Sequence, residues 1–254
     1  MLVFAVLFLL SCYTILIYDH TVQTYIIMRL HKKLLTLYAK MIMMSVYSLS
    51  YYSIKRNDKM QETKRQKQKN LTRNLLIDTA IIELGKKGIM STKTADIAKA
   101  AAVSHGTIFS HFQTQEDLLI AVVEEFGNRI SKRLHELISV NCSLYEILQA
   151  HIKGLIEFEP FYTALIKERS LLPDSISNTY IMIQSSISFH IGLAAEREME
   201  QLTIKKTPVH LIFNTWIALI HYYLANNELF TSHGSILEKY AEELLQHYYN
   251  LIKI

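Results

Sequence analysis

The sequence predicts an all-helical protein. Among its 254 residues only three are proline and seven are glycine, and residues that favour helices dominate the remainder. No useful stretch alternates apolar and polar residues as a half-buried strand does, and no internal repeat is visible. Several serines and threonines are followed three residues later by an acidic residue, which is typical of helix starts. We therefore expect successive helices that pack their apolar faces together.

Residues 1–59 differ in composition from the rest of the chain. Met1–Tyr18 contains no charged residue and is long enough for a membrane span, and Leu34–Ser53 carries only Lys40. A secretory signal is disfavoured because no basic residue precedes the first apolar run. Two interpretations stay open for this extension. It is either a membrane segment, or upstream sequence translated from a mis-assigned start, with Met60 as the true first residue.

Charge is distributed unevenly along the chain, whose formal net charge is +4. Residues 60–115 hold nine Lys or Arg against four Asp or Glu, whereas residues 116–254 hold 11 against 17. A basic segment followed by an acidic one is consistent with a part that binds a polyanion such as nucleic acid. Charge runs more often lie on a solvated surface, so this observation needs a motif to support it.

Three helices are expected in the first regular part of the chain. The first begins near residue 71 and ends at Gly88, after two lysines that suit the end of a helix dipole. A short helix follows at about 94–101. Another starts after Ser104, a good N-cap, and ends near Phe112. The apolar face of the first helix has the i, i+3, i+4, i+7 spacing of Ile77, Ala80, Ile81 and Leu84.

The rest of the chain reads as a bundle of further helices. Residues 114–117 resemble a capping box that opens a long helix, with the apolar stripe Leu118, Val122, Phe126, Ile130 and Leu134. Later starts are marked by Ser143 with Glu146, by Ser235 with Glu238, and by Thr207-Pro208, which places a capping residue before proline. Pro160 and Pro173 interrupt the run between them. Five or six helices are expected in this region.

The two short helices have the pattern of a helix-turn-helix. The major groove of DNA is about 12 Å wide and admits one helix, which a neighbouring helix must brace. One set of side chains is spaced to bury the seam between the helices: Ile97, Ala98, Val103, Ile108 and Phe112. The side chains left outward are small or polar: Ser104, His105, Gly106, Thr107, Ser110 and His111.

This part of the sequence resembles the tetracycline-repressor (TetR/AcrR-like) family of transcriptional regulators. The similar stretch runs from Arg73 to about Phe126, roughly a quarter of the chain. It includes Leu76-Ile77-Asp78-Thr79-Ala80, Gly88, Asp96-Ile97-Ala98-Lys99-Ala100-Ala101, Val103-Ser104-His105-Gly106-Thr107-Ile108-Phe109, His111-Phe112 and Glu116-Asp117-Leu118-Leu119. The remainder resembles the family only in being helical and of the right length.

The resemblance implies a three-helix DNA-binding head at 70–130 and a helical ligand-binding and dimerisation domain at 131–254. It implies a cytoplasmic homodimer that represses transcription from a palindromic operator in double-stranded DNA and responds to an unknown small-molecule effector. A membrane is a possible partner only through residues 1–53. That would make the chain a membrane-tethered DNA-binding sensor, which is the main alternative.

The resemblance also implies which residues meet DNA. The matching positions near phosphates or base edges are Arg73, Thr94, Ser104, His105, Gly106, Thr107, Ser110 and His111. A flexible basic arm ahead of the first helix would add phosphate contacts through Lys64, Arg65, Lys67 and Lys69. Three positions depart from the family. Phe109 stands where Tyr is usual, Gln115 replaces a common Lys, and Ala102 replaces a turn Gly, which strains the turn if its φ is positive.

The C-terminal region is unusually aromatic, which favours an apolar or aromatic ligand, although core packing explains any single residue as well. Candidate pocket residues are Phe158, Tyr162, Tyr180, Phe189, Phe213 and Trp216. Glu157, Glu159, His190 and Arg197 are candidates for orienting the ligand. The resemblance further implies that the last two helices, 208–229 and 235–252, pair with those of a second chain through the stripe Ile236, Tyr240, Leu244, Tyr248 and Leu251.

Other classes of function find little support in the sequence. No Gly-rich phosphate loop, nucleophile elbow or metal-binding helix motif is present, so we expect neither catalytic residues nor a cofactor, and a helical enzyme or interaction module is the weaker alternative. Scattered histidines lack zinc-ligand spacing, so no metal is expected. The two cysteines, Cys12 and Cys142, form no disulfide framework, as is typical of a reducing compartment.

Overall fold

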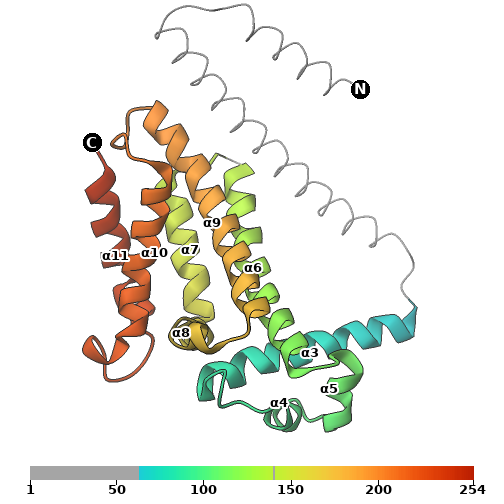
Figure 1. Cartoon of the computed structure of the whole chain (residues 1–254). Coiled ribbons are helices and arrows are strands. Elements are labelled where there is room, and N and C mark those ends of the chain that lie inside the picture. The colour runs from blue at the N-terminus through green and yellow to red at the C-terminus, as the bar shows by residue number, and fades with distance from the viewer. Residues whose placement is uncertain (1–62, 140) are drawn as a thin grey trace, which may run out of the picture. The chain divides into compact units, whose positions relative to one another are not determined.

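A computed structural model describes residues 63–139 and 141–254, and every regular element in these residues is helical. Figure 1 shows α3, α4 and α5 together at one end, and α6 leading from them into a bundle with α7, α9, α10 and α11. Residues 67–254 form one unit. The predicted all-helical class is confirmed, and the one β pairing in the described residues is an isolated bridge between Ile204 and Lys253. The apolar extension predicted at 1–59 lies outside them.

The head follows the predicted local signals closely. It consists of α3 (Lys64–Lys87), α4 (Thr94–Ala100) and α5 (His105–His111). Gly88 ends α3 with a φ of +88°, which glycine adopts without steric cost. Ser104 caps α5, since its side-chain oxygen accepts a hydrogen bond from the backbone N–H of Thr107 at 3.2 Å.

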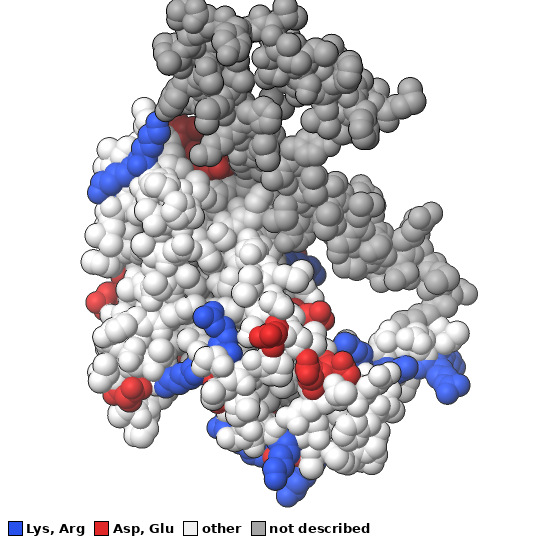
Figure 2. All heavy atoms as spheres, viewed as in Figure 1, with Lys and Arg blue, Asp and Glu red and all other residues white. Residues whose placement is uncertain are grey.

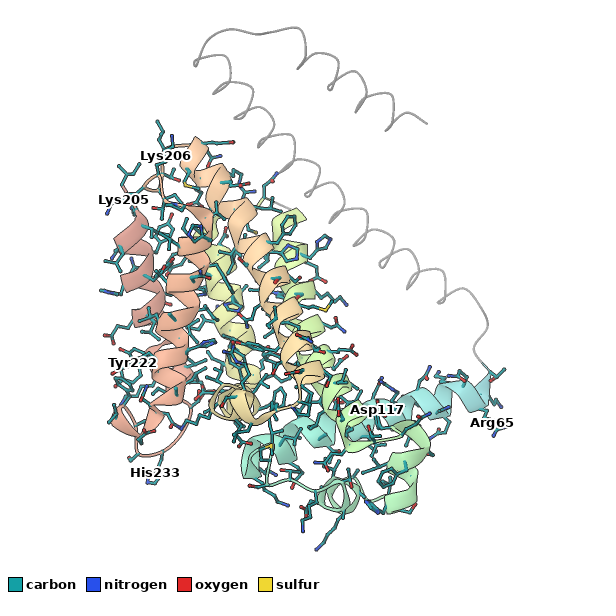
Figure 3. The ribbon with its side chains drawn as sticks, viewed as in Figure 1. Arg65, Asp117, Lys205, Lys206, Tyr222 and His233 are labelled. Atoms are coloured by element: carbon teal, nitrogen blue, oxygen red, sulfur yellow. The ribbon has the colours of Figure 1, made fainter. Side chains whose placement is uncertain are left out.

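The first helix begins earlier than the apolar pattern indicates, and the prediction of a flexible basic arm is wrong. Residues 64–69 form the opening turns of α3, where Arg65 lies in Figure 3. Thr63 Oγ1 accepts the backbone N–H of Gln66 at 3.2 Å, and the run from Lys64 to Asn70 holds no glycine or proline. Apolar periodicity appears only where the helix reaches the core, at Leu76, so it misses solvated turns.

The bundle is built on α6 (Gln115–Ser139) and α9 (Asp174–Glu200), which lie side by side. α7 (Leu144–Glu157), α8 (Glu159–Glu168), α10 (Val209–Ala225) and α11 (Ile236–Ile252) complete it, with short 3-10 turns at Arg169–Leu171 and Asn227–Leu229. The predicted capping boxes at Thr114 and Ser143 are present: Thr114 and Asp117 exchange hydrogen bonds of 2.9 and 3.0 Å. Apolar side chains from every α-helix form one core.

Two predictions about the last helices are wrong. Pro208 is itself the N-cap of α10, and Thr207 donates its hydroxyl to the carbonyl of Lys205 at 3.2 Å instead of capping the helix. The predicted dimer stripe on α11 is mostly internal, because three of its members are buried within the chain: Ile236, Leu244 and Tyr248. Leu251 remains 57% exposed. The period of the stripe indicates an apolar face, but it carries no information about which surface covers that face.

No helix in residues 63–139 or 141–254 is both long and apolar enough to cross a membrane. The two apolar stretches that suggested a membrane segment belong to the undescribed part of the chain.

Candidate nucleic-acid interface and ligand-binding core

A tight turn holds α4 and α5 together. The backbone N–H of Val103 donates to the carbonyl of Ala98 at 3.0 Å. Ala102 adopts a φ of +54°, the left-handed conformation that is costly for any residue other than glycine. The Thr94 hydroxyl and His105 Nε2 lie 2.9 Å apart, so a side-chain hydrogen bond joins the start of α4 to the start of α5. The second short helix is thereby fixed relative to the first, as a helix-turn-helix requires.

The outward face of α5 is small at its start. Ser104, His105, Gly106 and Ser110 are exposed, and Thr107 is half-buried. A Cβ built on Gly106 would meet nothing nearer than 3.9 Å, so this glycine leaves the helix backbone open to a close approach from outside. Most of the residues predicted at α5 are therefore accessible from outside the head.

Arg73 and His111 come together at the other end of α5. The Arg73 guanidinium lies 4.9 Å from the centre of the Phe112 ring, and His111 precedes that ring in the chain. Burial, with smaller contributions from Lys69 and Arg73, lowers the pKa of His111. Its Nδ1 is buried without a hydrogen-bond partner in the described structure. Both residues line an open cavity of about 340 Å³ between α3, α5 and α6.

Basic side chains flank α5 rather than lie on it. In Figure 2 the surface over α5 is largely white, with blue side chains along α3 and below α4. The exposed cations on these two sides are Lys64, Arg65, Lys67, Lys69, Lys93 and Lys99. Gln115, which replaces a common family lysine, donates its side-chain amide to the carbonyl of Thr92 at 3.2 Å. Its side chain thus ties α6 to the loop before α4.

A second candidate site lies in the bundle, where polar groups of three helices meet. Tyr162 is fully buried, and its hydroxyl lies 2.8 Å from His221 Nε2 and 3.4 Å from the Tyr180 hydroxyl. The Gln184 amide donates to the same Tyr162 oxygen at 3.2 Å. Burial raises the pKa of Tyr162, and burial together with the Arg169 charge lowers the pKa of His221 to about 4. These groups are neutral near pH 7 and can exchange hydrogen bonds with an uncharged polar group.

The predicted pocket aromatics do not meet at one place. Tyr162 stacks on Phe126, which Phe158 also contacts, so Phe158, Tyr162 and Tyr180 belong to one cluster. The other three lie elsewhere. Trp216 donates its indole N–H to His151 Nδ1 at 3.0 Å, Phe213 is buried in α10, and Phe189 contacts His190. Pattern reasoning did not single out His221 and Gln184, since neither stands out in sequence.

Two residues predicted to orient a ligand have other partners. The Glu159 carboxylate accepts hydrogen bonds from the backbone N–H groups of Ile236 and Leu237 at the start of α11. Arg197 donates to Asn141 and to the carbonyl of Cys142. Glu157 is exposed, and His190 is buried beside His135. Throughout residues 63–139 and 141–254, no group of three or more His, Cys, Asp or Glu is placed to hold a metal ion.

Comparison with known proteins bears on both sites. Residues 76–122 match the family model of bacterial regulatory proteins, tetR family. The "Probable acrEF/envCD operon repressor" of Escherichia coli (strain K12) is 33% identical over 90 residues, covering 35% of this chain and 34% of that protein. The fatty acid metabolism regulator protein of Bacillus subtilis (strain 168) is 32% identical over 82 residues, covering 32% and 42%. The chain thus spans about a third to two fifths of these two relatives.

Solved structures share the fold over a longer stretch. A TetR-family regulator from Agrobacterium tumefaciens has a TM-score of 0.62 at 18% identity, covering 73% of this chain and all of the other. FadR from Bacillus subtilis, solved with stearoyl-CoA, has a TM-score of 0.58 at 19% identity, covering 70% and 98%.

The head and bundle define a class, namely proteins that carry a helix-turn-helix on a helical domain. Within that class, residues 76–122 match the TetR family of bacterial regulatory proteins, and 73% of the chain shares the fold of a solved TetR-family regulator.

Proposed function

We propose that the chain is a transcriptional regulator, most simply a repressor, that binds a palindromic operator as a homodimer and releases it in response to a small molecule. The observation that carries this proposal is the head geometry: α5 is braced by α4 through the Thr94–His105 hydrogen bond and leaves Gly106 open to close approach. A helix presented in this way fits the major groove, with cations on both sides to meet phosphates.

The proposed contacts divide by chemistry. Arg73, Thr94, Ser104, Thr107 and His111 would lie at or near phosphates, and His105, Gly106 and Ser110 near base edges. Thr94 and His105 already bond to each other, which favours a positioning role for that pair. The basic opening turns of α3 add charge beside the groove.

A second copy would pack on the outer faces of α10 and α11. Tyr222 is 55% exposed and points away from the bundle in Figure 3, and Leu211 and Leu251 are also exposed. These apolar side chains support dimerisation through the same two helices as predicted, but Leu251 is the one member of the predicted stripe among them.

The effector site is proposed at the Tyr162 cluster, where an apolar or aromatic molecule that carries an uncharged polar group would exchange hydrogen bonds with Tyr162, Tyr180 and His221. α8 connects this cluster to the head. It carries Tyr162, and at its end the Glu168 carboxylate accepts the backbone N–H of Met90 at 2.7 Å. A Cβ on Gly85 of α3 would lie 2.8 Å from the backbone nitrogen of Phe161, so the two helices are in backbone contact. A shift of α8 therefore moves the head.

The operator is tested by selecting bound sequences from random DNA with the purified full-length chain. Enrichment of a palindrome with half-sites about one helical turn apart is expected for a dimer. Recovery of no preferred sequence would contradict the proposal. Arg73→Ala should weaken binding to every selected sequence alike, since a phosphate contact carries no base preference.

The effector site is tested by operator release. Long-chain acyl-CoA thioesters are the first compounds to try, because FadR was solved with stearoyl-CoA, and apolar aromatic compounds follow. Tyr162→Phe should weaken release by an active compound without changing operator affinity in its absence, whereas Tyr145→Phe, which removes a hydroxyl bonded to Glu242 instead, should leave release unchanged. Equal release from both variants would exclude the Tyr162 cluster as the effector site.

A further inference from the structure

α5 exposes an aromatic ring on its outward side. Phe109 is 44% exposed and follows Gly106 by three residues, so the ring and the open backbone share one side of the helix. The ring is held rather than free, because the His105 ring meets it edge to face, with centroids 5.0 Å apart and planes at 84°. His105 is in turn fixed by Thr94. A rigid apolar surface therefore stands where α5 would enter a groove.

The polar side chains around Phe109 are already engaged within the head. Ser110 donates its hydroxyl to the carbonyl of Thr107 at 2.7 Å, and the hydroxyls of Ser104 and Thr107 lie 2.8 Å apart. The sequence of α5, His-Gly-Thr-Ile-Phe-Ser-His, holds no Arg, Lys, Asn, Gln, Asp or Glu. Those are the side chains that pair with guanine, adenine or cytosine edges in the major groove. α5 itself therefore lacks the side chains that form the strongest hydrogen bonds to base edges.

We propose that Phe109 is a specificity-determining residue that recognises the C5-methyl group of a thymine in each half-site, an inference that rests on the DNA-binding role proposed above. The major-groove edges of the four base pairs differ chiefly in donors and acceptors, and the thymine methyl is the one apolar group among them. An exposed phenyl ring gains most by covering that methyl group, because apolar area on both partners leaves water. A phenyl ring also lacks the hydroxyl with which a tyrosine would bind a phosphate.

The test removes single methyl groups from the DNA. Each thymine of the selected operator is exchanged in turn for deoxyuridine, which keeps every hydrogen-bonding group and removes only the methyl group. For the wild-type full-length chain, removal of the methyl group that Phe109 covers should raise the Kd about threefold to fivefold at one symmetry-related thymine in each half-site. Exchange of the remaining thymines should have no comparable effect.

Protein variants then assign the methyl recognition to Phe109. With Phe109→Ala, the same deoxyuridine exchange should change the Kd by less than about 1.5-fold, as expected for coupled partners in a double-mutant cycle. Phe109→Tyr, which retains the ring, should keep the penalty. Met90→Ala, which truncates an exposed apolar side chain outside α5, is the matched control and should also keep it. Unchanged thermal unfolding of Phe109→Ala would show that the head still folds.

Salt separates this apolar interaction from backbone binding. The ratio of the two Kd values should be the same at about 50 and about 200 mM salt, although each Kd rises with salt because phosphate binding releases counterions. The inference is overturned if no thymine methyl matters to the wild-type chain, or if Phe109→Ala keeps the full deoxyuridine penalty. Either result leaves the proposed regulator intact when a preferred operator has been recovered. Failure to recover any operator would instead count against the regulator itself.

Discussion

The start of α11 depends on a carboxylate from another helix. Glu159 of α8 is 7% exposed and accepts hydrogen bonds from Ser235 Oγ at 2.5 Å, from the Ile236 N–H at 2.7 Å and from the Leu237 N–H at 3.0 Å. The first N–H groups of a helix have no partner within it, and a negative charge there also suits the helix dipole. One side chain thus satisfies the end of a helix 77 residues away in the chain.

Removal of this carboxylate should be costly. Glu159→Ala leaves two buried N–H groups without an acceptor, at about 1–3 kcal/mol each, so we expect the free energy of unfolding to fall by about 3–5 kcal/mol. For a chain of this size about 1 kcal/mol shifts the unfolding temperature by roughly 2–4 °C. The unfolding temperature should therefore fall by at least about 6 °C in differential scanning calorimetry. Glu159→Gln keeps one acceptor oxygen and should show roughly half of the fall.

Glu157 provides the matched control, since it precedes Glu159 by two residues and is exposed. Glu157→Ala should change the unfolding temperature by no more than about 2 °C. The reasoning would be refuted if Glu159→Ala unfolded within about 2 °C of Glu157→Ala, because the carboxylate would then contribute nothing that water does not supply.

Three further outcomes follow from the structure. Burial lowers the pKa of His151 to about 3, below that of an unfolded histidine, so its contribution to stability is lost progressively as the pH falls through about 6.5. The free energy of unfolding in urea should therefore fall between about pH 6.5 and about pH 5.0, and His151→Gln should lessen this fall by about 1.1 kcal/mol per pH unit. Ala102→Gly should raise the free energy of unfolding by about 0.5–1 kcal/mol, because glycine adopts the +54° φ without strain; a lower value would show that the turn needs the Ala102 methyl group. The opening turns of α3 carry four basic residues, Lys64, Arg65, Lys67 and Lys69, and replacing all four by alanine should keep the helix. The slope of log Kd against log salt concentration should become shallower by about 0.9 for each phosphate that these side chains neutralise. An unchanged slope would place the four positions away from DNA.

The head was predictable from sequence because its determinants are local. Ser104 caps α5 from one residue away, Thr114 and Asp117 cap α6 within one turn, and Gly88 ends α3 by its own φ. Each signal can be read within a few residues. The opening turns of α3 were not predicted because they do not touch the core, so the sequence there has no apolar periodicity from which a helix could be recognised.

The candidate site was predictable only in part, for a related reason. The sequence pattern marked the outward residues of α5, but it could not show that His105 is bonded to Thr94, 11 residues earlier, or that it braces Phe109. These interactions change the interpretation of the site. They show His105 supporting the partly exposed Phe109 ring, in addition to the base contact proposed for it.

The bundle resists prediction because its partners are set by tertiary packing. Aromatic composition marked Tyr162 and Tyr180 as candidates for a pocket or the core, but the polar atoms that face Tyr162 come from Gln184 and His221, the latter 59 residues away. The same contrast between local and tertiary determinants appears when the sequence match of the head is compared with the structural match of the whole fold. The head is matched at 33% identity over a short stretch, whereas the whole fold persists in structures only 18–19% identical. A head that meets DNA is constrained by the fixed shape of a groove, while a bundle needs only to fill its interior and can exchange neighbouring residues together. The residues of the proposed effector site must therefore be found from the packing of this chain, not from the family pattern.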